Sequence, residues 1–276
     1  MPTRLPPLLQ APASSIARRV GLARLGYRLA SPVWRSGRFA PAPRRFPVTS
    51  PAPVALLVDS LDRGGLEEMV FDLATTLDPA RYRPLAVCVE RGGAVADRLR
   101  SAGIAVHVLE RSEAAWSALL ARERVAVVNA HYTRFGLRQS RALGIPTVHV
   151  LHNSYVWLNE RGAARFAASF AGIDHFVAVS SSVARYARRR FGIGPERLEL
   201  VPNGIRLERL DLDRREERRA RMRSVLGVAE DAVVFLLPGT YEPRKGHHAA
   251  IPAFEALARR HARAVLVCVG GSPEPS

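Results

Sequence analysis

Residues 54–90 read VALLVDSLDRGGLEEMVFDLATTLDPARYRPLAVCVE, and this stretch decides the fold. It begins with the apolar run Val54–Val58 and reaches a second apolar run at Leu85–Val89. Short runs that are apolar throughout are typical of strands buried inside a parallel sheet. The residues between them carry an apolar stripe with spacings of three and four, which predicts an amphipathic helix: Leu66, Met69, Val70, Leu73 and Leu77.

The same alternation continues along the chain. Further strands are expected at 104–109, 125–128, 147–151, 176–179 and 198–201, and helices at 94–102, 113–121, 135–143, 163–170 and 182–191. Repeated strand–helix units with short joints predict an α/β fold, a doubly wound parallel sheet with helices on both faces. A second alternation follows, with a strand at 233–237, a helix at 247–260 and a strand at 264–269.

We therefore divide the chain of 276 residues into four parts. Residues 1–51 are a basic leader, expected to be unfolded, and 52–205 form one complete Rossmann-like domain. Residues 206–231 are a charged linker, and 232–276 are the start of a second domain. We expect the chain to be truncated there, since one strand–helix–strand unit is too small for an independent core.

The net charge of +16 is concentrated in the leader, which has nine arginines and no acidic residue. The leader is an unfolded tail, a basic amphipathic element on an anionic membrane, or a nucleic-acid arm. The last is disfavoured because no lysine-rich or aromatic-interleaved pattern accompanies the arginines. No apolar run approaches the roughly 18 residues of a spanning helix. The two cysteines exclude a disulfide framework and favour the cytoplasm.

Gly64-Gly65 separate the first strand from its helix. Glycines there let a ligand approach the backbone, and a helix N-terminus offers free N–H groups to a phosphate. A tight strand–helix turn explains them equally well. The loop does not match G-x-G-x-x-G, so a dinucleotide oxidoreductase is disfavoured.

Polar residues follow several predicted strands. His152 and Asn153 come after the strand ending at Leu151, and His131 and Tyr132 end another strand. Ligands of open parallel sheets bind at the carboxyl ends of the strands, so these side chains are candidate contacts. A structural loop histidine is the alternative for His152. His149, inside its strand, is predicted to be a packed core residue.

Ser180 starts a helix after the strand 176–179, where its main predicted role is that of a cap, with ligand contact secondary. Asn203-Gly204 predict a turn after the last strand of the first domain. The pair Asp211-x-Asp213 lies in the charged linker rather than at a strand end, and no other spacing resembles a metal site. We therefore predict no bound metal.

Residues 238–246 read PGTYEPRKG, after the second domain's first strand and before its helix. Arg244 and Lys245, beside a glycine at a helix start, suit a diphosphate because arginine binds two oxygens and lysine supplies a point charge. Lys245 is the single lysine among 41 basic residues. Because arginine occupies every other basic position, the lysine at this position suggests that a lysine is specifically required here.

Several of these segments together resemble one known family. The segments are 59–67 (DSLDRGGLE), 151–153 (LHN), 177–180 (VAVS), 201–205 (VPNGI), 239–246 (GTYEPRKG) and 267–274 (VCVGGSPE). In this order they look like the family 4 retaining glycosyltransferases of the GT-B fold. The resemblance covers residues 54–274.

The resemblance implies two Rossmann-like domains around a cleft, the first mainly for the acceptor and the second mainly for the nucleotide-sugar donor. It implies sugar transfer with retention and without a metal or other cofactor. Gly64, Gly65, Arg244 and Lys245 would lie at the donor diphosphate, and His152 would be the catalytic residue near the transferred sugar. Further possible substrate contacts are Asn153, His131, Tyr132, Ser180, Asn203, Gly204 and Thr240.

The implied acceptor is a saccharide or a lipid-linked glycan, reached in the cytoplasm, with peripheral contact at the inner face of the membrane. Two departures matter: Thr240 stands where many members have arginine, and the later E-x(7)-E segment lies beyond Ser276. The chain is then a glycosyltransferase that is inactive by itself or completed by a second polypeptide, a non-catalytic glycan-binding or scaffold remnant, or a GT-B-like sugar-nucleotide epimerase. Nucleic acid is not an expected partner.

Overall fold

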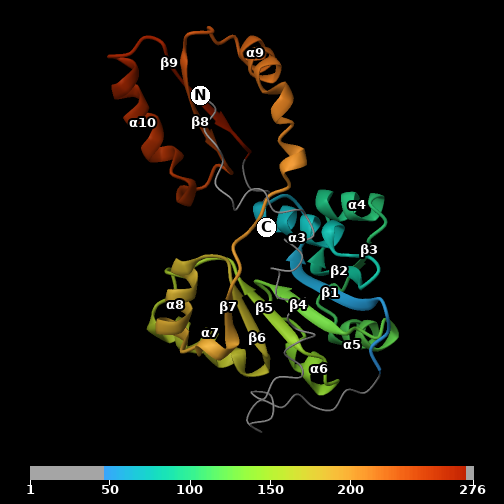
Figure 1. Ribbon diagram of the computed structural model, residues 1–276. Helices are drawn as coiled ribbons and strands as arrows, with labels where there is room; N and C mark the ends of the chain where they lie inside the picture. The colour runs from blue at the N-terminus through green and yellow to red at the C-terminus, as the bar shows by residue number, and fades with distance from the viewer. Residues whose placement is uncertain (1–46, 272–276) are drawn as a thin grey trace, which may run out of the picture. The chain divides into compact units, whose positions relative to one another are not determined.

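The computed structural model describes residues 47–271, which form two compact units (Figure 1). The first unit ends at Ile205 and the second begins at Arg206. Residues 1–46 and 272–276 lie outside the described residues. The predicted roles of the leader therefore remain predictions.

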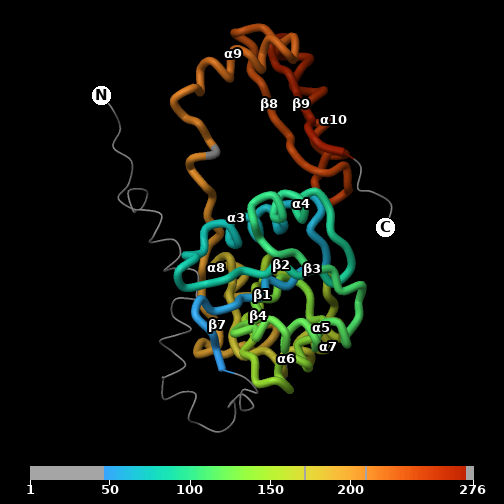
Figure 2. The backbone as a smooth tube through the Cα atoms, turned by 90° about the vertical axis from the view of Figure 1, so that its right-hand side faces the viewer, coloured from blue at the N-terminus to red at the C-terminus, as the bar shows by residue number. Residues whose placement is uncertain are grey.

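The first unit contains one parallel sheet of seven strands in the order β3-β2-β1-β4-β5-β6-β7 (Figures 1 and 2). The strands are β1 (Ala52–Ser60), β2 (Tyr82–Arg91), β3 (Ala105–Val108), β4 (Val127–His131), β5 (Thr147–Leu151), β6 (His175–Ala178) and β7 (Leu198–Leu200). The strand order reverses between β1 and β4, and sheets of this kind bind ligands outside the carboxyl ends of the strands at such a switch point.

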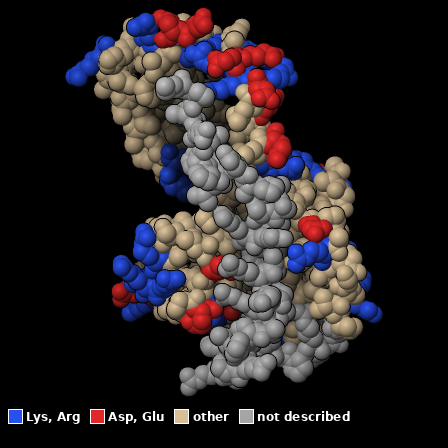
Figure 3. All heavy atoms as spheres, viewed as in Figure 1, with Lys and Arg blue, Asp and Glu red and all other residues tan. Residues whose placement is uncertain are grey.

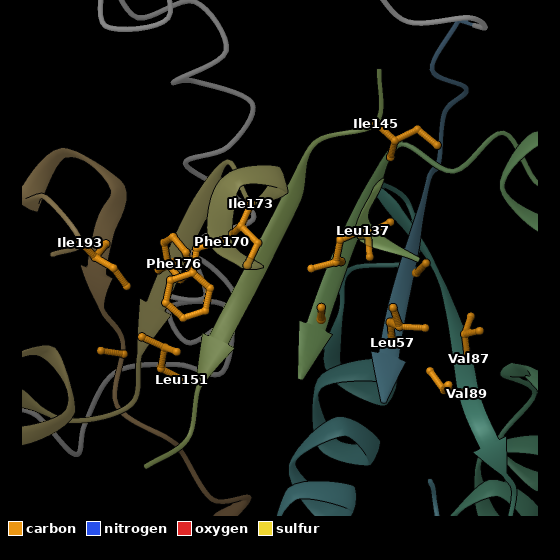
Figure 4. Close-up of a cluster of buried hydrophobic side chains, with 14 of the residues drawn as sticks. Leu57, Val87, Val89, Leu137, Ile145, Leu151, Phe170, Ile173, Phe176 and Ile193 are labelled. Carbon is orange, nitrogen blue, oxygen red and sulfur yellow. The ribbon is translucent and has the colours of Figure 1, made fainter. Parts of the chain in front are cut away.

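Helices connect the strands: α3 (Gly65–Thr76), α4 (Ala94–Ser101), α5 (Glu113–Arg122), α6 (Leu137–Ala142), α7 (Glu160–Ala168) and α8 (Ser181–Phe191). Two buried clusters show which helices cover which face of the sheet. The cluster on one face includes side chains of α3 and α4, such as Val70 and Leu99. The other includes side chains of α5, α6, α7 and α8. Figure 4 shows part of this second cluster, with Leu137 of α6 and Phe176 of β6 among the labelled side chains. The predicted α/β fold with helices on both faces is confirmed.

Burial of the strands explains their apolar sequences. Val54 to Val58 of β1 are all fully buried, with alternate side chains in the two clusters. Because both faces of the sheet are covered, successive residues must all be apolar. Cys88 on β2 is also buried and carries a free thiol, whose pKa burial raises to about 11.

Most element boundaries differ from the sequence prediction by a few residues, and three of these differences bear on the site or have a clear local cause. Strand β4 runs from Val127 to His131 rather than over 125–128, which brings His131 into the sheet. Helix α6 begins at Leu137 rather than at 135, because Gly136 has a left-handed conformation (φ +69°) and its carbonyl accepts a bond from Trp116 Nε1 at 2.9 Å. Helix α7 begins at Glu160 rather than at 163, because the Asn159 side chain caps Gly162 N at 2.8 Å.

The predicted turn at Asn203-Gly204 is wrong. Residues 201–206 form neither turn nor regular structure, and Gly204 has no positive φ. Asn-Gly favours a turn where a chain must reverse onto a neighbouring strand. Here no strand returns after β7, since the chain passes into the second unit.

The second unit contains α9 (Arg215–Val225), β8 (Val233–Pro238), α10 (His247–Ala258) and β9 (Ala264–Val269). β8 and β9 pair in parallel over six residues, and α10 runs beside them (Figure 2). Apolar side chains of this sheet are exposed, with Val233 at 59% and Leu236 at 62%. The two-stranded sheet has too little covering to bury its faces.

None of the helices within residues 47–271 has the length and apolarity required to cross a bilayer.

Candidate functional site

Polar side chains gather where β4 and β5 end. His131 is the last residue of β4 and pairs with Val150 of β5, so His152 comes just past the same edge of the sheet. Tyr132 directly follows His131, and Asn153 directly follows His152, in the loops after the two strands. The structure thus brings together four of the predicted site residues, at the carboxyl edge of the parallel sheet.

The two histidines are in direct contact. Nδ1 of His131 lies 3.1 Å from Nε2 of His152, within hydrogen-bond distance. His131 is 1% exposed, while His152 is partly exposed. Burial lowers the pKa of His152 to about 4, and burial together with the two neighbouring histidines lowers the pKa of His131 well below its ordinary value. Both rings are therefore neutral near pH 7.

Neighbouring aromatic and amide groups hold the His152 ring in place. The ring of Tyr132 stacks on His152, with centroids 5.4 Å apart and planes inclined by 21°. Asn153 donates a hydrogen bond from Nδ2 to the Tyr132 hydroxyl, and its Oδ1 accepts one from Tyr155 N at 2.8 Å. Tyr132 and Tyr155 both have positive φ, +62° and +45°. Such backbone strain in residues other than glycine is concentrated at functional sites.

The other two polar residues of this region have structural roles. His149 points to the opposite face of the sheet, is fully buried, and lies with its ring centroid 6.2 Å from those of Phe170 and Phe176. The prediction of a packed core histidine is confirmed. Ser180 caps α8, its hydroxyl accepting a bond from Val183 N at 3.2 Å, as predicted. Its secondary role as a ligand contact stays a prediction.

The loop between β1 and α3 is anchored by α4. The carbonyl of Leu61 accepts bonds from Val95 N and Ala96 N, both at 3.1 Å. Gly93 packs so closely under this loop that an added Cβ would overlap the backbone of Asp62. These contacts fix the path of the loop into Gly64, the N-cap residue of α3.

At the start of α3 no side chain caps the helix, and a Cβ added at Gly65 would meet nothing within 4 Å. Backbone N–H groups at an uncapped helix start can bind an anion. Glu67 lies in this first turn, and partial burial raises the pKa of its carboxyl above the ordinary value. Gly65 thus has the open environment that the diphosphate prediction requires, whereas a Cβ added at Gly64 would overlap the Glu67 carboxylate.

In the second unit the predicted cations follow β8. Arg244 and Lys245 end a short 3-10 helix, Pro243–Lys245, and Gly246 in left-handed conformation (φ +76°) leads into α10. Arg244 Nε donates to Glu242 Oε2 at 2.7 Å, and the Thr240 hydroxyl donates to the same carboxylate. These bonds, with Arg244 first, lower the pKa of Glu242 to about 2. Lys245 is exposed and makes no salt bridge with any residue between 47 and 271.

The close approach of two loops shapes this end of the second unit. Gly239 N donates to Val269 O at 2.8 Å, and Tyr241 N donates to Gly271 O at 2.9 Å. An added Cβ at Gly270 would overlap the Gly239 carbonyl. Glycine at position 270 is therefore required for the segment after β9 to pack against the segment after β8.

The predicted site residues fall into three groups. His131, Tyr132, His152 and Asn153 are in mutual contact, and Gly64 and Gly65 follow β1 in the same unit. Thr240, Arg244 and Lys245 lie in the second unit. Asn203 and Gly204 are exposed in the segment that leads to the second unit, and no described contact links them to any of these groups.

Sequence reasoning missed Tyr155 and Glu242. Tyr155 is 3% exposed, and its hydroxyl has no partner among the residues the structure describes. Its position three residues after His152 was the available signal. Glu242 organises both Thr240 and Arg244, and the opposite charges at 242 and 244 could have revealed it.

The described residues were also compared with the requirements of a metal site. Within residues 47–271 no group of three or more His, Cys, Asp or Glu side chains is arranged to hold a metal ion. Asp211, the first residue of the D-x-D pair, forms an ion pair with Arg218 at 2.6 Å.

Comparison with known proteins places the chain in a family. The model of Glycosyltransferase Family 4 matches residues 63–209, more than half of the chain. The chain therefore belongs to this family, and the resemblance noted in the sequence is confirmed. Members of the family are enzymes of the transferase type.

Two curated relatives are D-inositol 3-phosphate glycosyltransferases. That of Catenulispora acidiphila is 31% identical over 163 residues, covering 52% of this chain and 38% of the relative. That of Geodermatophilus obscurus is 32% identical over 134 residues, covering 43% of this chain and 29% of the relative. The chain thus spans only about a third of the length of these relatives.

Solved structures of other proteins share the fold. Anabaena HepE in complex with UDP and glucose aligns with a TM-score of 0.64 at 20% identity, covering 80% of this chain and 61% of HepE. A glycosyltransferase from Rickettsia africae aligns with a TM-score of 0.62 at 15% identity, covering 80% of this chain and 68% of the other. The predicted GT-B type of architecture is confirmed.

Proposed function

We propose that this chain takes part in transferring a sugar from a nucleotide-sugar donor to a saccharide or lipid-linked acceptor, with retention and without a metal. The observation that carries the proposal is the polar edge at β4 and β5 in a chain of Glycosyltransferase Family 4. The solved structures of HepE with UDP and with UDP-glucose support a nucleotide-sugar as the ligand.

Arg244 and Lys245 are proposed to hold the donor diphosphate. Glu242 directs Arg244 through one nitrogen, and Lys245 keeps its ammonium group exposed. When the bond between the sugar and the diphosphate breaks, negative charge develops on the leaving oxygen. Fixed cations stabilise this charge in the transition state more than in the ground state. They supply the role that a divalent ion has in other transferases, which supports transfer without a metal.

The backbone at Gly64 and Gly65 is proposed to contribute N–H donors to a phosphate oxygen. The N-cap residue Gly64 provides no side-chain cap to α3, and Gly65 leaves room for a ligand to approach. The carboxylate of Glu67 lies in the same turn, so a bound phosphate would have to displace or protonate it. Its raised pKa lowers the cost of that step, because the neutral acid does not repel an anion.

His152 is proposed to contact the transferred sugar as the catalytic residue. Its ring is neutral near pH 7, and its Nδ1 takes no part in the bond to His131. A neutral imidazole nitrogen can hydrogen-bond a sugar hydroxyl without adding charge where the glycosyl cation develops. Asn153 and Tyr132 are proposed to position the ring rather than to react.

An acceptor at an anionic membrane is supported by one surface of the first unit. Val156 and Trp157, in the loop after β5, are 74% and 65% exposed. Exposed arginines lie on α7 (Arg161 and Arg165) and on α8 (Arg185, Arg188 and Arg189). Figure 3 shows basic side chains gathered on the side of the first unit where α7 and α8 lie in Figure 1. Tryptophan beside basic residues favours the interface of an anionic bilayer.

A transfer assay tests the proposal. The protein is incubated in EDTA with UDP-glucose or GDP-mannose and with a saccharide or phosphatidylinositol acceptor, and products are analysed by mass spectrometry and NMR. We expect a glycosylated acceptor whose anomeric configuration equals that of the donor. An inverted product contradicts retention, and a product that forms only with added Mg²⁺ contradicts transfer without a metal. Donor binding without any product supports the non-catalytic alternative.

A further inference from the structure

The bond between His131 and His152 constrains where the protons of both rings lie. It joins Nδ1 of His131 to Nε2 of His152 at 3.1 Å, so one nitrogen must carry a hydrogen and the other a lone pair. Both rings are neutral near pH 7, and a neutral imidazole has a single N–H. The choice of donor therefore fixes the tautomer of both histidines at once.

The buried surroundings of His131 decide between the two arrangements. Its Nε2 is buried and has no hydrogen-bond partner among the residues the structure describes. If His152 were the donor, His131 would carry its hydrogen on this Nε2, leaving a buried N–H without an acceptor. If His131 is the donor, Nε2 keeps only a lone pair. Buried donors without partners are rarer in proteins than unsatisfied acceptors, so the second arrangement is favoured.

We propose that His131 is a positioning residue that fixes His152 in the tautomer with its hydrogen on Nδ1. His152 then presents an N–H donor, and not a lone pair, at the edge of the sheet. The inference rests on the proposed function only in taking this donor to meet an oxygen of the sugar nucleotide. The tautomer itself is a property of the free protein.

Among the described residues, His131 is the side chain that determines which ring nitrogen of His152 carries the hydrogen. The Tyr132 ring lies against the face of His152, which limits rotation of the imidazole plane but exchanges no proton with it. Asn153 directs its amide to the Tyr132 hydroxyl and to the backbone of Tyr155, away from the imidazole nitrogens. The His149 ring packs against Phe170 and Phe176 and makes no hydrogen bond to His152 among the described residues. No other side chain hydrogen-bonds the His152 ring within the described part of the chain.

The tautomer defines which ligand atom His152 can recognise. An Nδ1–H group binds an acceptor, such as the oxygen of a sugar hydroxyl, an ether or a phosphate. It cannot accept a proton from an attacking hydroxyl group, since both its nitrogens are then occupied by hydrogen bonds. In this arrangement His152 stabilises a bound oxygen and does not act as a general base.

Long-range ¹H–¹⁵N NMR of the full chain measures the tautomer directly. Each of the eight histidines gives a pattern that distinguishes a protonated from an unprotonated ring nitrogen. For the wild-type protein at pH 7.5 we expect protonated Nδ1 and unprotonated Nε2 in both His131 and His152. A wild-type spectrum with the hydrogen of His152 on Nε2 overturns the inference, and it requires no variant to fold.

Two substitutions separate positioning from a purely structural role. In His131→Phe the donor is lost, and His152 should shift toward the Nε2–H tautomer that free imidazole side chains prefer. In His131→Asn the amide nitrogen can replace Nδ1 as the donor, so the wild-type tautomer should return. His107→Asn on β3 is the matched control, a partly buried histidine remote from β5, and should leave His152 unchanged. An unchanged His152 tautomer in His131→Phe contradicts the positioning role.

Calorimetric titration with UDP-glucose then tests the link to the ligand. His131→Phe should weaken the affinity roughly tenfold, the scale of one neutral hydrogen bond, and His131→Asn should recover most of it. Equal affinities of His131→Phe and the wild type contradict the link. If the NMR spectrum shows the expected tautomer while no sugar nucleotide binds, the proposed function fails and the positioning of His152 by His131 stands.

Discussion

At the scale of single residues, the isolated lysine is the most specific feature of the second unit. Lys245 is exposed, makes no salt bridge in the described part of the chain, and follows Arg244 at the end of the loop. In the proposed function its ammonium group binds a diphosphate oxygen. Such a charged hydrogen bond contributes about 1.5–3 kcal/mol to binding.

We therefore expect Lys245→Ala to weaken sugar-nucleotide binding by about 1.5–3 kcal/mol, measured by calorimetry. The matched control is Arg260→Ala, which removes an exposed cation after α10 without touching the loop. An affinity of Lys245→Ala equal to that of the control removes Lys245 from the site.

The buried histidines give the protein a defined response to acid. Burial lowers the pKa of His149 to about 3 and of His152 to about 4, from 6.5 in the unfolded chain. Below pH 6.5 the unfolded state therefore binds more protons than the folded state, so the free energy of unfolding decreases as the pH is lowered. Each such histidine contributes a slope of up to about 1.4 kcal/mol per pH unit, which fades as the pH rises through the unfolded-state pKa of 6.5.

Urea unfolding between pH 7.5 and pH 4.5 measures this slope. His149→Leu should flatten it by the share of one histidine, because the leucine binds no proton in either state. His149 is suited to the test since it packs against Phe170 and Phe176 and not in the candidate site. The same slope in His149→Leu and the wild type would show that His149 is protonated equally in both states.

At the scale of elements, the packing of α5 against the start of α6 depends on Gly136. Its φ is +69°, and a Cβ at this position would overlap the fully buried indole of Trp116. Gly192 provides a matched control at the end of α8, with φ +66° and open space around its Cβ position. Both substitutions by alanine bring the left-handed penalty, but only one adds a clash.

We expect Gly192→Ala to lower the free energy of unfolding by about 1–2 kcal/mol. Gly136→Ala should cost a further 1–3 kcal/mol or so, because the core around Trp116 must shift. Chemical denaturation measures both values. Equal losses in the two variants would mean that the joint accommodates the added methyl group without displacing Trp116.

The exposed loop after β5 makes a prediction about membranes. Of the three tryptophans, Trp116 is fully buried and Trp157 is exposed, so in a Trp34→Phe background the vesicle response reports on Trp157. Its fluorescence should shift to shorter wavelength, and be quenched by brominated lipid, with phosphatidylglycerol vesicles but not with phosphatidylcholine vesicles. Vesicle binding without quenching would assign the contact to another part of the chain.

The same element scale shows what sequence can and cannot reveal. The strands were predictable because burial on both faces demands continuous apolar runs, as in β1. The start of α6 was not, since it depends on Trp116 reaching Gly136 across the fold. The edge residues His131 and His152 were predictable from their positions after strands. Their 3.1 Å contact depends on the register of β4 and β5, which no local pattern encodes.

At the scale of the whole molecule, the chain contains two units that differ in how much of their apolar surface is buried. The first buries two extensive clusters around a seven-stranded sheet, whereas no side chain of α9, β8, α10 or β9 is fully buried. The family match lies almost entirely in the first unit. The proposed contacts to the diphosphate by Arg244 and Lys245 therefore rest on the loop of the second unit and need direct measurement.

Calorimetric titration of the full chain with UDP-glucose and GDP-mannose, in EDTA, tests the central claim most directly. We predict saturable binding of one sugar nucleotide, with one molecule bound per chain and with affinity lost in a variant carrying both Lys245→Ala and Arg244→Ala. Absence of saturable binding by either compound, in a protein whose NMR spectrum shows it to be folded, would contradict the account.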